Sequence, residues 1–130
     1  MKSAVCRALI AALCLVLALF FAFVGWNKAF SSLADLARYG SWTVYLPELA
    51  GRIVGWSEMA LALGLITGLL PKRHKLARFS ALALVANQIV AALFHLTHGE
   101  AGALPQNLVL IVMLLLIAQA KRPGPERETA

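Results

Sequence analysis

Four long apolar segments, separated by short polar ones, make up most of the chain. The first, residues 8–26, contains no charged side chain. A helix needs about 20 mostly apolar residues to cross the hydrocarbon core of a bilayer. We therefore predict an all-α fold, a four-transmembrane-helix bundle, with spans at about residues 6–27, 48–70, 76–97 and 104–120.

A secretory signal peptide is the alternative interpretation of the first apolar segment. Lys2 and Arg7 precede the segment, as basic residues precede the apolar core of a signal peptide. The apolar run is longer than that core usually is, and no small-x-small cleavage site follows it. We therefore expect a helix that remains in the membrane.

The connection between the first and second spans has a pattern of its own. Ser32 and Asp35 form a weak capping box, and Leu33 and Leu36 lie on one apolar face. Gly40 is suited to end a helix that starts at this box. We predict a short interfacial helix in this first outer loop.

The composition supports a membrane protein of one domain. Hydrophobic residues make up 61% of the 130 residues and charged residues only 14%, whereas soluble domains average about 25% charged residues. This length fits one domain, which we place at residues 1–120. The segment 121–130 has two prolines and no apolar periodicity, so we expect a disordered cytoplasmic tail there.

The basic residues predict the orientation in the membrane. The net charge is +6, but these residues flank the spans, which favours the lipid bilayer as partner and argues against nucleic acid. By the positive-inside rule both termini are cytoplasmic. Nine of the twelve basic residues lie in the N-terminus, the second loop or the tail: Lys2, Arg7, Lys72, Arg73, Lys75, Arg78, Lys121, Arg122 and Arg127.

An acidic residue, Glu58, lies inside the second predicted span. An ionised side chain at mid-membrane costs at least about 2.5 kcal/mol, so such residues usually face a bundle interior and mark function. On a helix Gly51, Gly55, Glu58 and Ala62 share one face, which is small apart from the acid. Small residues at this spacing let another helix approach closely and shield the carboxylate from lipid.

Further unusual polar and aromatic residues fall at the outer ends of the predicted spans. We predict an outward-facing polar pocket with Glu58 as its floor. The alternative is a purely structural ion pair between Glu58 and either Lys28 or Arg52. The pocket candidates are Lys28, Trp42, Arg52, Trp56, Glu58, Gln88, His95 and Asn107.

Residues His95, His98 and Glu100 lie near the end of the third predicted span. Histidines three positions apart on a helix can share a metal ion. Two histidines and an acid at a helix end are more often hydrogen-bonding groups, so we predict no metal site.

Two glycine pairs are expected to be packing surfaces. Gly51-x-x-x-Gly55 and Gly64-x-x-x-Gly68 have the spacing at which helices approach closely, and they lie on opposite faces of one helix. One pair is expected to serve the bundle, and the other a second protomer or another membrane protein.

The order and spacing of several short motifs resemble those of the DoxX-like family of small four-helix bacterial membrane proteins. The resemblance covers about residues 15–120. The motifs that carry it are Gly25-x-x-Lys28, LARYGSW at 36–42, Leu46-Pro47, Gly51-Arg52-x-x-Gly55-Trp56-x-Glu58, ALGL at 62–65, His95, HGE at 98–100 and PQN at 105–107.

The resemblance implies a small subunit or accessory of a quinone- or thiol-linked redox system in the bacterial inner membrane, rather than an independent enzyme. A quinone or small organic ligand would then occupy the pocket, with Glu58 and Lys28 setting its charge and His95 exchanging protons. The outward half has no cysteine, which argues against direct thiol exchange there.

Two other functions remain as alternatives. One is a non-catalytic assembly partner of another membrane protein, which would dock through the glycine faces. The other is a small-solute transporter, which the lack of inverted repeats and broken helices disfavours.

Overall fold

The computed structural model describes residues 3–70 and 72–123, and within them it is all-helical, which confirms the predicted fold class. Residues 124–130, most of the predicted tail, lie outside the described residues. Within the described segments, four helices are long and apolar enough to cross a membrane. They are α1 (Ala4–Phe30), α3 (Glu48–Ile66) with its continuation η2 (Thr67–Leu69), α4 (His74–Thr97), and α5 (Leu104–Ala120), which the short turn η3 (Ala101–Ala103) precedes.

The helices begin where the sequence supplies suitable residues. The Ser3 hydroxyl accepts a hydrogen bond from the Cys6 backbone N–H and so caps α1. Pro47 is the N-cap of α3, and Pro105 lies in the first turn of α5, where its missing N–H leaves no intrahelical bond unmade.

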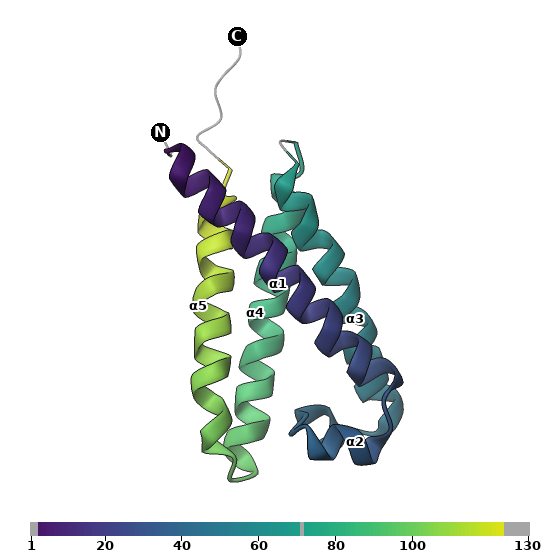
Figure 1. The fold of residues 1–130 in the computed structure, drawn as a ribbon. Coiled ribbons are helices and arrows are strands. Elements are labelled where there is room, and N and C mark those ends of the chain that lie inside the picture. The colour runs from purple at the N-terminus through teal and green to yellow at the C-terminus, as the bar shows by residue number, and fades with distance from the viewer. Residues whose placement is uncertain (1–2, 71, 124–130) are drawn as a thin grey trace.

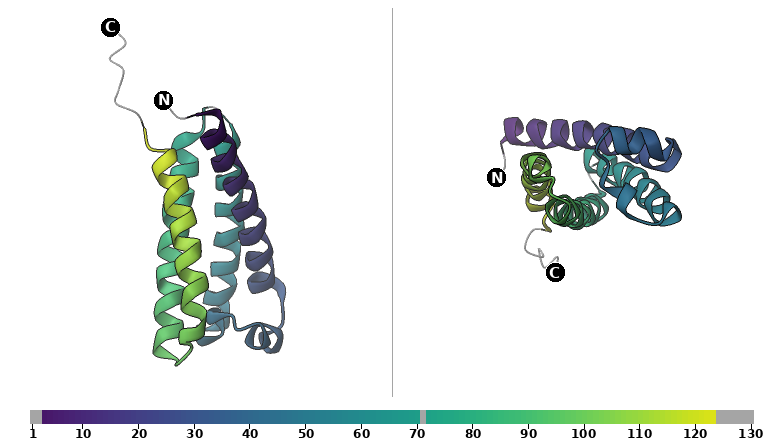
Figure 2. Two further views of the ribbon diagram at one scale, coloured as in Figure 1. Left: turned by 60° about the vertical axis from the view of Figure 1, so that its left-hand side comes forward. Right: turned by 90° about the horizontal axis from the view of Figure 1, so that it is seen from below.

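The bundle has two unlike ends. The start of α1, the end of α5 and the α3–α4 connection lie at one end, and the segments between α1 and α3 and between α4 and α5 lie at the other (Figure 1). Helix α1 crosses over α3 and diverges from α5 toward this second end, whereas α4 and α5 run side by side (Figures 1 and 2).

The crossing of α1 and α3 depends on two glycines that the sequence places on facing helices. A Cβ atom at Gly25 would lie 2.6 Å from the Gly55 carbonyl oxygen. A Cβ atom at Gly55 would lie 2.6 Å from both the Gly25 carbonyl oxygen and the Ala29 nitrogen. Only glycine at both positions lets the two backbones come this close.

The other glycines of the predicted packing surfaces also face the chain's own residues. Gly51 lies against Thr43, Gly64 against Ser80, and Gly68 against Cys14 and Ala77. All four motif glycines are buried inside the bundle. A second protomer or partner protein would therefore need a surface other than these glycine faces, because the chain itself occupies both.

The core has an apolar half and a polar half. The apolar half includes Cys14, Leu17, Leu65, Leu84 and Leu114, each fully buried. The buried polar side chains of the other half come from η1, from the last turns of α1 and α4, from the middle of α3 and α4, and from the start of α5. They are Lys28, Thr43, Glu58, Gln88, His95 and Asn107.

The connection between α1 and α3 contains the short helix α2 (Leu33–Arg38) and the turn η1 (Trp42–Tyr45). The Ser32 hydroxyl accepts a hydrogen bond from the Asp35 backbone N–H, and Gly40 follows the helix with a φ of 73°. Figure 1 shows α2 lying across the end of the bundle. A short helix is thus present in this loop, while its position at a membrane surface stays a prediction.

Candidate functional site

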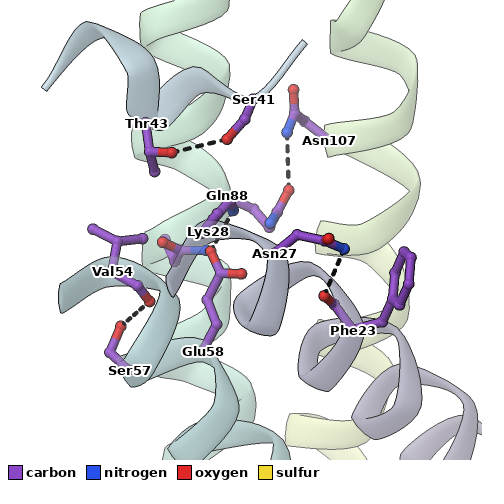
Figure 3. Close-up of polar contacts among 11 residues, drawn as sticks. Phe23, Asn27, Lys28, Ser41, Thr43, Val54, Ser57, Glu58, Gln88 and Asn107 are labelled. Atoms are coloured by element: carbon purple, nitrogen blue, oxygen red, sulfur yellow. Dashed lines mark hydrogen bonds and ion pairs between the residues drawn. The ribbon is translucent and has the colours of Figure 1, made fainter. Parts of the chain in front are cut away.

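An ion pair joins α1 and α3 inside the bundle. Lys28 Nζ lies 2.5 Å from Glu58 Oε1, and the two side chains are only 6% and 1% exposed (Figure 3). The same carboxylate oxygen accepts a hydrogen bond of 3.1 Å from Asn87 Nδ2 of α4. The second oxygen, Glu58 Oε2, is buried and has no hydrogen-bond partner among the described residues.

A pair of amide side chains joins α4 and α5 in the same half of the bundle. Asn107 Nδ2 donates a hydrogen bond of 2.9 Å to Gln88 Oε1 (Figure 3). This leaves Asn107 Oδ1, which is also buried, without a donor in the described part of the chain. Glu58 and Asn107 therefore each have one polar atom that is hydrogen-bonded and a second that has no partner among the described residues.

Trp42 of η1 lies beside the Lys28 ammonium group. Lys28 Nζ is 5.6 Å from the centroid of the indole ring, within the range of a cation–π interaction. On another side the indole packs against Phe94, with ring centroids 5.2 Å apart. The indole is only 5% exposed, and its Nε1–H finds no acceptor in the described segments.

His95, Glu100 and Tyr45 form a cluster at the α2 end of the bundle. The Tyr45 hydroxyl donates a hydrogen bond of 2.5 Å to Glu100 Oε1, which lowers the pKa of Glu100 and raises the pKa of Tyr45. His95 Nδ1 lies 3.4 Å from the same oxygen but without hydrogen-bond alignment. The Tyr45 ring stacks on His98 with ring centroids 3.7 Å apart.

A cavity of about 400 Å³ lies where α1 and α5 diverge. Apolar side chains of α1 and α5 line it, among them Phe20, Phe21 and Leu110, and so do residues 39–42 of the connection between α1 and α3. This volume lies in the range of small-molecule sites. Six of the eight predicted pocket residues line it: Lys28, Trp42, Glu58, Gln88, His95 and Asn107.

The structure places the other two predicted pocket residues, Arg52 and Trp56, elsewhere. Trp56 is 56% exposed and packs on Phe30, because two residues of helix turn it by about 200° from Glu58. The Arg52 guanidinium donates to the backbone carbonyl oxygens of Lys28 and Ser31. It satisfies carbonyls at the end of α1, where cations are favoured, instead of pairing with Glu58.

Some contacts of this site could not be derived from the sequence. Asn87 carries a polar group in an apolar span, which is a signal, but its partner on α3 depends on how the helices pack. The Tyr45–Glu100 hydrogen bond joins residues 55 positions apart, so no local sequence pattern indicates it.

In the described segments, no three His, Cys, Asp or Glu side chains are grouped as metal ligands.

Comparison with known proteins adds one finding. The family model described as the DoxX-like family matches residues 12–117, which is most of the chain. No significant match is found among curated proteins or among solved structures.

Proposed function

This chain belongs to the DoxX-like family and has four helices suited to a lipid bilayer, and from that premise we propose that it is a small accessory subunit of a membrane redox system. In that role it binds a quinone-type ligand, a flat ring with polar substituents and an apolar tail, in the cavity between α1 and α5. The chain positions and exchanges this ligand with a partner enzyme and does not itself act as an enzyme.

One observation carries the proposal. The cavity has apolar walls, yet four of the residues that line it hold a buried polar atom for which the described part of the chain supplies no hydrogen-bond partner: Trp42 Nε1, Glu58 Oε2, His95 Nδ1 and Asn107 Oδ1. Buried polar groups are nearly always hydrogen-bonded in folded proteins, so each exception calls for an explanation, and a role in binding or catalysis is one. An apolar pocket with a few convergent polar groups is also typical of sites for small organic ligands.

The charges in the cavity favour an uncharged ligand. Lys28 and Glu58 compensate each other at 2.5 Å, so the two groups together bring no net charge. A charged ligand would have to lose its hydration shell without meeting an unpaired opposite charge, which is costly in a site of low polarity. A neutral ring with oxygen substituents avoids this cost.

The proposed orientation places the cavity toward the outside of a bacterial inner membrane. Lys72, Arg73 and Lys75 lie in the α3–α4 connection or the first turn of α4, and Lys121 follows α5, so these cations share the end of the bundle opposite the cavity. By the positive-inside rule that end is cytoplasmic. A ligand would then enter from the outer half of the bilayer.

Bound lipid-like molecules test this function. The wild-type chain is produced in its membrane, transferred to nanodiscs and extracted, and quinones are quantified by mass spectrometry per mole of protein. We expect nearly one quinone per protein in the wild type. Glu58→Gln and His95→Ala should each lose most of this bound quinone. Trp56→Phe, on the outer face of α3, should keep the wild-type amount.

The same preparation separates the proposal from an assembly role. Circular dichroism and gel filtration of each variant establish that the bundle has formed. If folded wild-type protein carries no quinone, and instead co-purifies with the same membrane protein whether or not Glu58 and His95 are substituted, the ligand-binding function is wrong and an assembly role replaces it.

A further inference from the structure

A surface groove runs between α4 and α5 and shares no lining residue with the cavity. Its volume is about 370 Å³. Arg78 and Gln119 line it near the end of the bundle where α5 ends and α4 begins, and aliphatic side chains line the remainder. We call it the α4–α5 groove.

Arg78 links the two helices at the polar end of the α4–α5 groove. Its Nη1 donates a hydrogen bond of 2.7 Å to the Ala118 backbone carbonyl oxygen, near the end of α5. A guanidinium group carries five N–H donors in a fork that matches a phosphate group. The half-buried Arg78 side chain can therefore hold a phosphate while one donor bonds the carbonyl, and the exposed Gln119 amide can donate to the same anion.

Further positive charge adjoins this polar end. Lys75 precedes Arg78 by three residues, so the two are neighbours on the surface of α4. The Arg122 backbone N–H donates to the Gln119 carbonyl oxygen at 3.2 Å, so Arg122 lies in the turn that directly follows α5. Neither Asp nor Glu is among the described residues that line the groove, and its polar end therefore favours an anion.

The rest of the α4–α5 groove is apolar and open to lipid. Four aliphatic side chains line it, each between 39% and 51% exposed: Leu82, Val112, Leu115 and Leu116. Val112 lies seven residues, or about 10 Å of helix, before Gln119 on α5. Because α4 and α5 run side by side, the groove extends from the basic end toward the middle of the bundle (Figures 1 and 2).

We propose that the α4–α5 groove binds an anionic phospholipid, with the phosphate at Arg78 and Gln119 and an acyl chain along the aliphatic side chains. Charge complementarity and the apolar lining together select this occupant. A soluble anion would leave the apolar part uncovered, and a lipid without net charge would not match the cations beside Arg78. Basic pockets between membrane helices bind anionic headgroups in this way. The site is independent of what the cavity binds.

Lipids that differ only in the headgroup test this site. Full-length wild-type protein is delipidated in detergent and titrated with phosphatidylglycerol, with phosphatidylcholine of the same acyl chains, and with glycerophosphoglycerol, the deacylated anionic headgroup. Native mass spectrometry counts the molecules bound to each chain. We expect one phosphatidylglycerol to bind about tenfold or more tightly than phosphatidylcholine, and the deacylated headgroup not to bind at the same concentrations.

Two variants with the same change in charge locate the headgroup. Arg78→Gln removes the guanidinium fork, so the affinity for phosphatidylglycerol should fall to that for phosphatidylcholine. Lys121→Gln is the matched control at the same end of the bundle. Its Cε lies 3.5 Å from the position of a Cβ at Gly68, so the side chain points toward the α3 side and not into the groove. This variant should keep the wild-type preference.

A second pair of variants tests the acyl chain without changing charge. Leu116→Trp fills the apolar part of the α4–α5 groove and should remove most of the phosphatidylglycerol binding. Leu108→Trp makes the same change at an exposed position of α5 outside the groove and should not. Circular dichroism establishes that each variant has folded, and this pair decides the matter if Arg78→Gln does not fold.

Several results would overturn the proposal and leave the proposed function of the cavity untouched. One is equal affinity for phosphatidylglycerol and phosphatidylcholine. Another is an equal loss of affinity in Arg78→Gln and Lys121→Gln, because net charge and not the groove would then determine binding. Binding of glycerophosphoglycerol as tightly as the intact lipid would replace the lipid by a soluble phosphate compound. Unchanged phosphatidylglycerol binding in folded Leu116→Trp would place the lipid elsewhere.

Discussion

Lys28 Nζ and Glu58 Oε1 are 2.5 Å apart across the crossing of α1 and α3, and the Gly25–Gly55 backbone contact lies immediately beside them. The glycines let the helices approach closely enough for a lysine to reach the carboxylate, and the ion pair fixes which residues of the two helices face each other. Packing and charge pairing therefore depend on each other at this crossing.

Removing one member of the pair should destabilise the bundle strongly. Lys28→Met leaves a buried carboxylate and Glu58→Gln leaves a buried ammonium group, and an uncompensated buried charge costs about 3–5 kcal/mol. The double variant leaves neither charge, so it should lose much less stability than the sum of the two single variants. Equilibrium unfolding in mixed micelles gives the three free-energy differences. Strict additivity would mean that the two groups do not interact.

A methyl group at the helix crossing should also destabilise the fold. In Gly55→Ala the new Cβ meets backbone atoms of Gly25 and Ala29, which cannot rotate away as a flexible side chain does. Overpacking of this kind costs about 1–3 kcal/mol. Gly102→Ala is the matched control, because a Cβ at Gly102 meets no atom of the described segments within 4 Å. Similar midpoints of thermal unfolding for the two variants would contradict the tight crossing.

The fold class and the buried acid could be predicted from the sequence because both depend on local properties. Segment length and apolar content determine whether a helix can cross a bilayer. The small face around Glu58 follows from the 3.6-residue period of one helix. The same period places Trp56 on the opposite side of α3 from Glu58, and Trp56 is exposed there. The motif that the two residues share in the family resemblance does not indicate this difference in direction.

Contacts between helices could not be predicted in the same way. The sequence left Lys28 and Arg52 as alternative partners of Glu58, and the choice depends on the crossing of α1 and α3. Arg52 instead reaches the carbonyl groups at the end of α1. The buried polar atoms that lack a partner among the described residues also could not be predicted, because each side chain could have found a partner on any neighbouring helix.

The Tyr45–Glu100 hydrogen bond should make the loop end of the bundle sensitive to acid. The Tyr45 hydroxyl lowers the pKa of Glu100 below its ordinary value of about 4.3 in the folded state. The stabilisation is therefore fully present above that ordinary value, and it is lost as the pH falls through the lowered folded-state pKa. Tyr45→Phe should raise the titration midpoint of Glu100, measured by NMR of carboxyl-labelled glutamate.

Tyr39→Phe is the control for this titration. Tyr39 is an exposed tyrosine in the same connection, so its hydroxyl should not affect the midpoint. An unchanged midpoint in Tyr45→Phe would show that His95 and His98, and not the phenol, lower the pKa of Glu100.

The proposed orientation predicts which loops reagents can reach from outside the cell. Cysteines are introduced at Gly102, in η3 at the cavity end, and at Arg122, which follows α5 at the other end. The exposed native Cys6 is first replaced by serine, because it would react itself. A membrane-impermeant maleimide applied to intact spheroplasts should label Gly102→Cys, and Arg122→Cys should react only after lysis. This result follows if the basic residues of the α3–α4 connection and those after α5 lie on the cytoplasmic side of the membrane. The reverse labelling pattern would place the cavity on the cytoplasmic side.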